Sequence, residues 1–428
     1  MNAPLSSTLL ALAGALLLAG CATLQPAGPS RGGSWIGNVP PGEEHYLGRT
    51  KSGLDVLAEQ DFDILRGKST GLVVNHTAFD RDNRHIIDVL HEAPGVELVA
   101  LFGPEHGIRG TEDYFVDDAV DRRTGLPIYS LYGENRAPTA DMLEGIDVLV
   151  FDMQDVGTRF YTYIGTMALC MEAAAANDVE FVVLDRPNAV GGKRVEGAVV
   201  EEDLLGRPIA IRTIATRHGM TIGELALLFN EEFGGIGVDL TVVPMENWRR
   251  WMYFDQTGLL WKHPSPAMKT MNGAVLYPGF GPSMSTTLAT ARGLDRPFEK
   301  YGAPYMDGHA VAANLARRDT PGVRFVPVSF TPTAPYHRYQ DEECHGVAAI
   351  LYDRERLDPI TAGLHMMQAM YETHPEEYAP IPRFATIIGN EDVWPMLTEQ
   401  GMRPEDIAET FRPKLLEFKA LREQYLLY

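Results

Sequence analysis

Four apolar segments of the sequence each run into polar side chains that could carry acid–base or sugar-binding chemistry. The segments cover residues 71–75, 96–102, 147–152 and 180–185, and their nearly continuous apolar character predicts strands buried on both faces. The polar residues at or just beyond their ends are Asn75, Glu105, His106, Asp152, Asp155, Asp185 and Arg186. Because ligands bind at the carboxyl ends of the strands in an open α/β sheet, we expect these side chains to share one crevice.

The loop after the second segment holds the candidate for a general acid. Residues 103–110 read Gly-Pro-Glu-His-Gly-Ile-Arg-Gly, and the glycines and proline predict a turn that presents Glu105 beside His106 and Arg109. A partly desolvated carboxyl group keeps its proton near neutral pH and can protonate a leaving oxygen. Glu105 could instead cap a helix or pair with Arg109.

The loops after the third and fourth segments have the residue types that bind sugars. The third loop adds Arg159, Tyr161 and Tyr163 to its two acids, and the fourth adds Asn188 to Asp185 and Arg186. Aromatic rings stack on the C–H faces of a sugar, and polar side chains bind its hydroxyls. The structural alternatives are that the two tyrosines pack inward and that Arg186 pairs with Asp185.

Other chemistries lack their sequence patterns. No glycine-rich phosphate loop opens a helix after a strand. The Gly-x-Ser-x-Gly pattern occurs at residues 28–32 and 67–71, but neither occurrence joins the end of a strand segment to a helix, as a nucleophile elbow requires. The histidines show no pair at the spacing of metal ligands. We therefore expect neither a cofactor nor a metal ion.

Helical patterns fill the gaps between the strand segments. They cover residues 81–93, 139–145 and 164–177, and a capping box at Thr221 and Glu224 begins a further helix. Strands that alternate with helices predict an α/β fold with a mostly parallel sheet. We divide the chain into an α/β domain at 49–240 and a C-terminal α/β domain at 241–428, whose final apolar positions at helical spacing should dock on a core.

The first residues predict export and a lipid anchor. An apolar run at residues 9–18 is too short to span a bilayer, and it leads into Leu-Ala-Gly-Cys at residues 18–21, which resembles a lipoprotein processing box. We expect a signal peptide at 1–20, lipidation of Cys21 and a Pro/Gly/Ser-rich tether at 21–48. The protein would then face the outside of a bacterial membrane, in the cell envelope. An ordinary cleaved signal with an incidental cysteine is the alternative.

The charge of the chain restricts its partners. The sequence has 37 basic and 58 acidic residues and a net charge of −21, which argues against a nucleic acid. An anionic substrate must therefore meet a local cluster of arginines. The remaining cysteines, Cys170 and Cys344, are expected to be buried thiols.

Several linked motifs resemble the exo-β-N-acetylmuramidase family, from about residue 54 to the end. They are the loops at 103–110, 147–163 and 184–192, His-Gly-Met-Thr from His218, and the terminal residues 421–428. The resemblance implies a Rossmann-like domain followed by a smaller α/β domain, with the active cleft between them. It also implies release of terminal N-acetylmuramic acid from peptidoglycan fragments, with the family's acid at Glu105.

One stretch departs from the family pattern. After Tyr-Pro-Gly at residues 277–279, Met284 and Thr290 stand where the family carries glutamates, whereas Arg292 and Gly293 match.

We therefore expect a glycosidase in which His106 or Asp152 tunes Glu105. The second group needed for cleavage could be Asp152, Asp155 or Asp185, or the 2-acetamido group of the substrate itself. Candidate cations for the lactyl carboxylate are Arg109, Arg159, Arg186 and Arg292. A lipid-anchored sugar-binding protein without turnover is the alternative.

Overall fold

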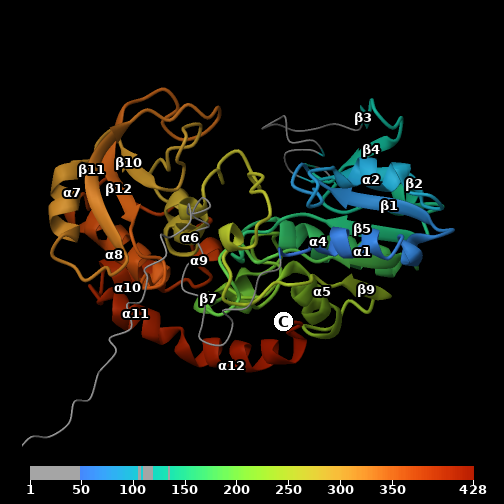
Figure 1. Ribbon diagram of the computed structural model, residues 1–428. Helices are drawn as coiled ribbons and strands as arrows, with labels where there is room; N and C mark the ends of the chain where they lie inside the picture. The colour runs from blue at the N-terminus through green and yellow to red at the C-terminus, as the bar shows by residue number, and fades with distance from the viewer. Residues whose placement is uncertain (1–48, 105–107, 109–118, 134) are drawn as a thin grey trace, which may run out of the picture. The chain divides into compact units, whose positions relative to one another are not determined.

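The computed structural model describes residues 49–104, 108, 119–133 and 135–428 (Figure 1). The chain divides into two compact units, Met1–Asn38 and Val39–Tyr428, and every described residue belongs to the second. The predicted signal peptide, Cys21 and the tether lie outside the described residues, as do Glu105, His106 and Arg109.

The described residues build a seven-stranded sheet in the order β3-β4-β2-β1-β5-β6-β9. Its strands are β1 (Ser69–Val74), β2 (Glu97–Gly103), β3 (Ala119–Val120), β4 (Pro127–Ser130), β5 (Val148–Asp152), β6 (Glu180–Leu184) and β9 (Leu240–Val243). All neighbours pair in parallel except β3, which runs antiparallel to β4 at the edge. The chain reverses its direction of progress across the sheet between β1 and β5, which is where a doubly wound sheet opens its ligand crevice.

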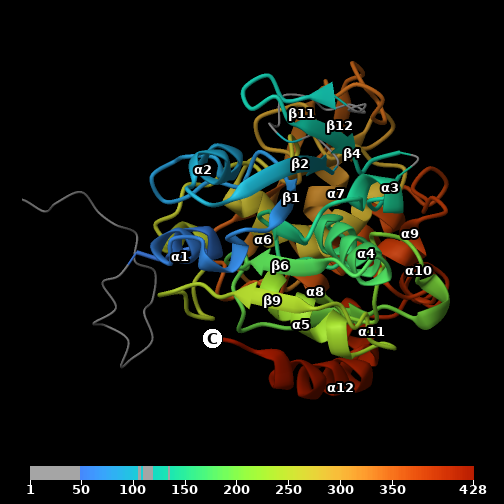
Figure 2. The same cartoon turned by 90° about the vertical axis from the view of Figure 1, so that its right-hand side faces the viewer.

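Helices cover both faces of this sheet (Figure 2). On one face lie α1 (Gly53–Glu59) and α2 (Ile86–Glu92), and on the other lie α3 (Ala140–Leu143), α4 (Tyr163–Ala176) and α5 (Ile222–Glu231). Successive strand residues point to opposite faces, so Val150 packs with the α1–α2 side and Phe151 with the α4–α5 side. Burial on both faces explains why the strand segments are apolar throughout.

The sequence-based expectations hold for the elements with strong patterns. All four strand segments are strands, and the predicted helices correspond to α2, α3, α4 and α5. The capping box is confirmed, because Thr221 accepts a hydrogen bond from the Glu224 N–H and the Glu224 carboxylate accepts one from that of Thr221. Strands β4 and β9 were not predicted, since each is four residues long and only part of each is buried.

A second, antiparallel sheet has the order β10-β12-β11. Its strands are β10 (Lys300–Ala303), β11 (Val323–Phe330) and β12 (Cys344–Leu351), and the helices of this region are α6 (Met271–Phe280), α7 (Gly308–Leu315), α8 (Pro359–Thr373), α9 (Phe384–Ile388), α10 (Val393–Thr398) and α11 (Pro404–Thr410). A short pair, β7 (Glu196–Val199) and β8 (Ala215–Arg217), completes the strands. The fold class is therefore α/β, with a mostly parallel sheet followed by a smaller α/β region. The proposed division at residue 240 stays a prediction, and it falls inside β9.

The end of the chain returns to the first sheet. Helix α12 (Arg412–Arg422) is followed by Tyr425, which is buried as expected, and by Tyr428, whose hydroxyl donates to Asp185 Oδ2 at 2.6 Å and accepts from the Met245 N–H at 2.7 Å. Its ring meets Trp248 edge to face, with the two centroids 5.2 Å apart. The last residues are thus tied to the carboxyl edge of the sheet beside β6.

Cys170 and Cys344 are free and buried, as expected.

No helix in the described part of the chain combines the length and the apolar character needed to cross a membrane.

We predict that Tyr428→Phe lowers the free energy of unfolding by about 1–3 kcal/mol. The change removes one hydrogen bond from the buried Asp185 carboxylate and one from the Met245 N–H. Urea denaturation followed by circular dichroism measures the change. The matched control is Tyr425→Phe, whose hydroxyl bonds the half-buried Glu232 carboxylate, which water can still solvate, so the loss should be smaller. Equal stability of Tyr428→Phe and the wild type would contradict the prediction.

Candidate active site

A pocket of about 790 Å³ lies beside the carboxyl edge of the seven-stranded sheet, with walls from both halves of the sequence. The first half supplies Tyr132, which follows β4, and residues 160–163, which follow β5. The second half supplies Tyr277 of α6, Arg292 and Ile387 of α9. The cleft that the resemblance implies therefore exists between the two regions.

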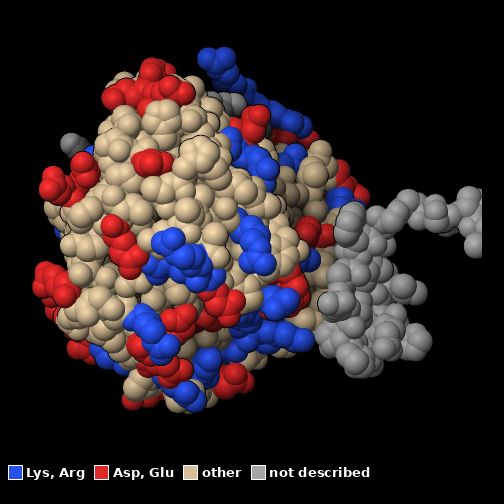
Figure 3. Space-filling view, turned by 90° about the vertical axis from the view of Figure 1, so that its left-hand side faces the viewer, with Lys and Arg blue, Asp and Glu red and all other residues tan. Residues whose placement is uncertain are grey.

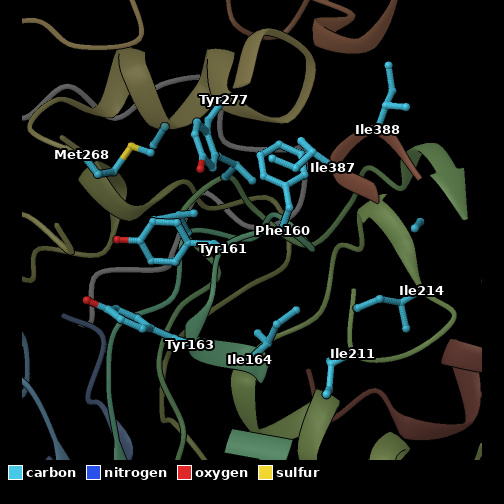
Figure 4. Packing of buried hydrophobic residues seen from close by; sticks show 14 of the residues in the cluster. Phe160, Tyr161, Tyr163, Ile164, Ile211, Ile214, Met268, Tyr277, Ile387 and Ile388 are labelled. Atoms are coloured by element: carbon cyan, nitrogen blue, oxygen red, sulfur yellow. The ribbon is translucent and has the colours of Figure 1, made fainter. Parts of the chain in front are cut away.

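Aromatic rings line one side of the pocket, and Figure 4 shows how Tyr161, Tyr163 and Tyr277 pack together. Tyr161 lies between Tyr163 and Tyr277, and the ring centroids are 5.0 and 6.2 Å apart with nearly perpendicular planes. Tyr161 and Tyr163 are buried, as the structural alternative expected, yet both line the pocket. Burial raises the pKa of Tyr161 well above its usual value, so its hydroxyl stays protonated and can donate or accept a hydrogen bond.

This wall is fixed by the guanidinium of Arg159, which has no exposed surface. Nη1 donates to the Ile209 carbonyl at 2.8 Å and Nη2 to the Ile387 carbonyl at 2.6 Å. Ile209 and Ile387 themselves line the pocket. Burial lowers the pKa of Arg159 to about 9, which leaves it charged at neutral pH. In the structure Arg159 thus holds pocket walls together, and its predicted contact with substrate stays untested.

Cations face the pocket from its second half. The basic residues that line it are Lys269, Arg292, His337 and Arg383, and none of the described lining residues is Asp or Glu. Desolvation by the surrounding protein, and next the charge of Arg292, lower the pKa of Arg383. On the outer face drawn in Figure 3, by contrast, basic and acidic side chains are interspersed. The local cluster of cations that an acidic protein needs for an anionic ligand is therefore present.

Arg292 is held without a carboxylate partner among the interactions that the structure shows for it. Its Nη2 lies 3.7 Å from the Met284 sulfur, and its guanidinium lies over the Phe298 ring, 5.2 Å from the centroid. Met284 is one of the two positions where the resemblance described above implies a glutamate. A glutamate there would lie within reach of Arg292, whereas the weakly accepting thioether leaves the positive charge largely uncompensated.

The polar strand ends themselves form a buried layer beside the pocket rather than its lining. Asp152 and Arg186 form an ion pair in which Nη2 donates to Oδ2 at 2.8 Å, and neither side chain is more than 5% exposed. Asp185 accepts hydrogen bonds from the Arg186 N–H, the Gly223 N–H and two hydroxyls. Burial raises the pKa of Asp185 to about 7. Arg186 therefore pairs with Asp152, not with Asp185 as the structural alternative had it.

A second buried pair lies in the same layer. His218 Nε2 and Asp155 Oδ2 are 3.9 Å apart, and both residues are at most 6% exposed. Burial raises the pKa of Asp155 to about 7. Burial, and then nearby arginines, lower the pKa of His218 to about 3, so this ring is neutral at physiological pH. At 3.9 Å the two atoms are too far apart for a hydrogen bond, and neither residue lines the pocket.

The two predicted asparagines shape loops. Asn75 Oδ1 accepts from the Thr77 N–H at 2.9 Å, and Asn188 donates to the Met220 carbonyl at 2.8 Å. Both are buried and outside the pocket lining. Of the predicted substrate-binding residues, Tyr161, Tyr163 and Arg292 are the ones that the structure brings to the pocket.

The loop with the predicted acid begins at the same edge of the sheet. Strand β2 ends at Gly103 between β1 and β4, and Tyr132, two residues past β4, lines the pocket. Ile108 is buried in the core on the α1–α2 side. Glu105 follows the end of β2 by two residues in the sequence and lies outside the described residues.

Sequence reasoning missed several lining residues, among them Lys269, Arg383, Tyr132 and Tyr336. They lie outside helices and strands, in segments without a periodic pattern, and only the fold brings them together. The described residues contain no group of His, Cys, Asp and Glu that could hold a metal ion.

Comparison with known proteins covers nearly all of the described chain. Residues 70–272 match the model for the N-terminal region of exo-β-N-acetylmuramidase NamZ, and residues 275–428 match that for its C-terminal region. The chain is 40% identical over 384 residues to peptidoglycan β-N-acetylmuramidase NamZ of Bacillus subtilis (strain 168), covering 89% of this chain and 92% of that protein. Crystal structures of two DUF1343 family proteins from Bacteroides fragilis NCTC 9343 are similar, with TM-scores of 0.80 and 0.74 and identities of 38% and 30%, each over 89% of this chain and 99% of the other. The chain therefore belongs to the exo-β-N-acetylmuramidase NamZ family.

Proposed function

We propose that this protein is an exo-acting glycosidase that releases terminal N-acetylmuramic acid from peptidoglycan fragments, with Glu105 as the general acid. The observation that carries the proposal is a pocket with an aromatic wall and several cations in a protein whose net charge is −21. Aromatic rings suit the faces of a sugar, and the cations suit the lactyl carboxylate that distinguishes muramic acid from glucosamine. The relative from Bacillus subtilis, named as a peptidoglycan β-N-acetylmuramidase, supports the same reaction.

The lactyl carboxylate binds to Arg292 in this proposal. Of the four arginines suggested by the sequence, Arg159 donates to carbonyl groups, Arg186 pairs with Asp152, and Arg109 lies outside the described residues. Arg292 lines the pocket, and its contact with Met284 leaves its donors available for a bidentate bond to a carboxylate.

We assign the acid to Glu105 because its loop follows β2, which pairs with β4, and Tyr132 just past β4 lines the pocket. Asp152, Asp155 and Asp185 are buried, are not among the lining residues and are bonded to other groups. With no carboxylate among the described lining residues, assistance by the substrate's own 2-acetamido group, which needs one protein acid, fits better than a second aspartate.

A sugar-binding protein without turnover remains the second candidate, because Met284 and Thr290 replace family glutamates. Met284 lines the pocket, whereas Thr290 is 5% exposed and outside the lining. Methionine in place of glutamate at position 284 changes the charge that a bound sugar meets, but it does not remove Glu105, the proposed acid. We therefore favour the enzyme.

The proposed location rests on the sequence pattern of the predicted signal peptide, Cys21 and the segment after it. We propose that Cys21 carries a lipid anchor and that the Pro/Gly/Ser-rich segment after it holds the protein off a bacterial membrane, in the cell envelope.

We expect Glu105→Gln to lower kcat by about 10²–10⁴-fold with KM nearly unchanged, because the amide cannot donate a proton to the leaving oxygen but keeps the shape of the side chain. The assay is release of free N-acetylmuramic acid from a MurNAc–GlcNAc disaccharide. The control is Glu97→Gln, an exposed residue at the opposite end of β2, which should act as the wild type. Full activity of Glu105→Gln would remove it as the acid, and a wild type that binds the disaccharide without cleaving it would favour the binder.

Replacement of Arg292 by Gln should raise KM for the muraminide by about 10–100-fold, the usual value of a bond between a charged donor and a carboxylate. The ratio of kcat/KM for a muraminide to that for the matching N-acetylglucosaminide, which lacks the lactyl group, should fall by the same factor. Arg317→Gln, an exposed arginine just after α7 and outside the pocket lining, is the control. An unchanged ratio in Arg292→Gln would refute the assignment.

Replacement of Cys21 by Ala should abolish incorporation of labelled palmitate and release the protein from the membrane fraction in a bacterial host. Unchanged membrane retention and labelling would contradict the anchor.

A further inference from the structure

The loop between β11 and β12 places an aromatic side chain on the pocket wall. Residues 331–343 connect Phe330 to Cys344, and Ala334, Pro335, Tyr336 and His337 line the pocket. Tyr336 is 90% exposed, the highest value among the exposed large hydrophobic residues of the described chain. A ring that lines a pocket and is nearly all open to solvent lies at the mouth of that pocket.

Three residues of the loop have backbone φ angles that non-glycine residues rarely adopt. Tyr336, Tyr339 and Asp341 have φ angles of 60°, 58° and 61°. Non-glycine residues with such angles are strained, and they persist where surrounding bonds impose them. Here the Tyr336 N–H donates to Gln340 Oε1 at 3.1 Å, and the Asp341 N–H donates to the Pro332 carbonyl at 2.8 Å. The backbone that presents Tyr336 is therefore fixed by the loop itself.

The same loop is joined to the segment that carries Arg292. The N–H groups of Thr333 and Ala334 both donate to the Arg292 carbonyl, at 3.2 and 3.3 Å. Gly293 has a φ of +87°, and a Cβ there would come within 2.4 Å of the Ala334 nitrogen. The two segments thus pack backbone against backbone, and the position of the Tyr336 ring is set relative to the proposed carboxylate-binding arginine.

An aromatic side chain from the other half of the chain lines the same pocket. Tyr132, two residues after β4, is 40% exposed. An enzyme that removes terminal sugars holds one sugar inside its pocket, and the rest of the chain must leave through the mouth. The next sugar then meets the residues at the mouth, where an exposed ring offers a flat apolar face for its C–H groups.

We propose that Tyr336 is a specificity-determining residue, and that its ring stacks on the leaving-group sugar next to the terminal N-acetylmuramic acid. This inference rests on the proposed function and extends it from the sugar that is released to the sugar that is left behind. The loop at 331–343 thereby favours oligosaccharide fragments over muraminides with small leaving groups.

The test compares two substrates that differ in the leaving group, with the full chain. One is the MurNAc–GlcNAc disaccharide, and the other is methyl β-N-acetylmuraminide, whose methyl group is too small to reach the ring. In Tyr336→Ala, kcat/KM for the disaccharide should fall about tenfold, as expected for loss of one stacking contact, while kcat/KM for the methyl glycoside changes less than about twofold.

Three further variants separate stacking from loop structure. Tyr336→Phe keeps the ring and should retain the wild-type ratio. Tyr336→Gly suits a φ of 60° but has no ring, so it should show the same selective loss as Tyr336→Ala. Val326→Ala, an exposed residue of β11 outside the pocket lining, should change neither substrate.

An equal loss on both substrates, or no loss on either, would overturn the role of Tyr336. A wild type that cleaves neither substrate would instead refute the proposed glycosidase itself, so the two failures can be told apart.

Discussion

The arrangement of the pocket depends on one buried cation. Arg159 follows β5, and its guanidinium reaches the carbonyls of Ile209, Thr386 and Ile387 without contact with water. A buried charge is costly unless its donors are bonded, so these carbonyls must stay where the guanidinium can reach them. Because the adjoining Phe160 and Tyr161 line the pocket, as do Ile209 and Ile387, the same bonds fix the walls from both halves of the chain.

At the carboxyl edge of the sheet, different residues support the loops and line the pocket. The residues closest to the strand ends, Asp152, Asp185 and Arg186, bond to one another, to loop backbone and to the returning Tyr428. The residues a few positions further along, such as Tyr161, reach the pocket. A polar layer bonded within itself gives the loops a rigid base, and the side chains that meet a ligand then need no strong bonds among themselves.

Much of the fold could be predicted from the sequence, because buried parallel strands such as the one ending at Asp152 leave a continuous apolar pattern. The short strand β4 and the edge strand β9 lack that pattern. The topology of the sheet predicts that the strand ends lie close together. The sequence does not show whether Asp185 binds substrate or accepts structural hydrogen bonds, because one of its donors, Tyr428, lies 243 residues away in the chain. For the same reason the sequence could not rank Arg159, Arg186 and Arg292. No sequence pattern around Lys269 or Tyr336 marks either residue, and they line the same pocket only because of the fold.

The central claim is that the anionic terminal sugar occupies the pocket between the aromatic wall and Arg292. A crystal structure of the Glu105→Gln variant with a bound MurNAc–GlcNAc disaccharide tests it most directly. We expect the lactyl carboxylate within hydrogen-bonding distance of the Arg292 guanidinium and the muramic ring against Tyr161. A disaccharide bound elsewhere, with its carboxylate on Arg186 or on no cation, would rule out this binding mode.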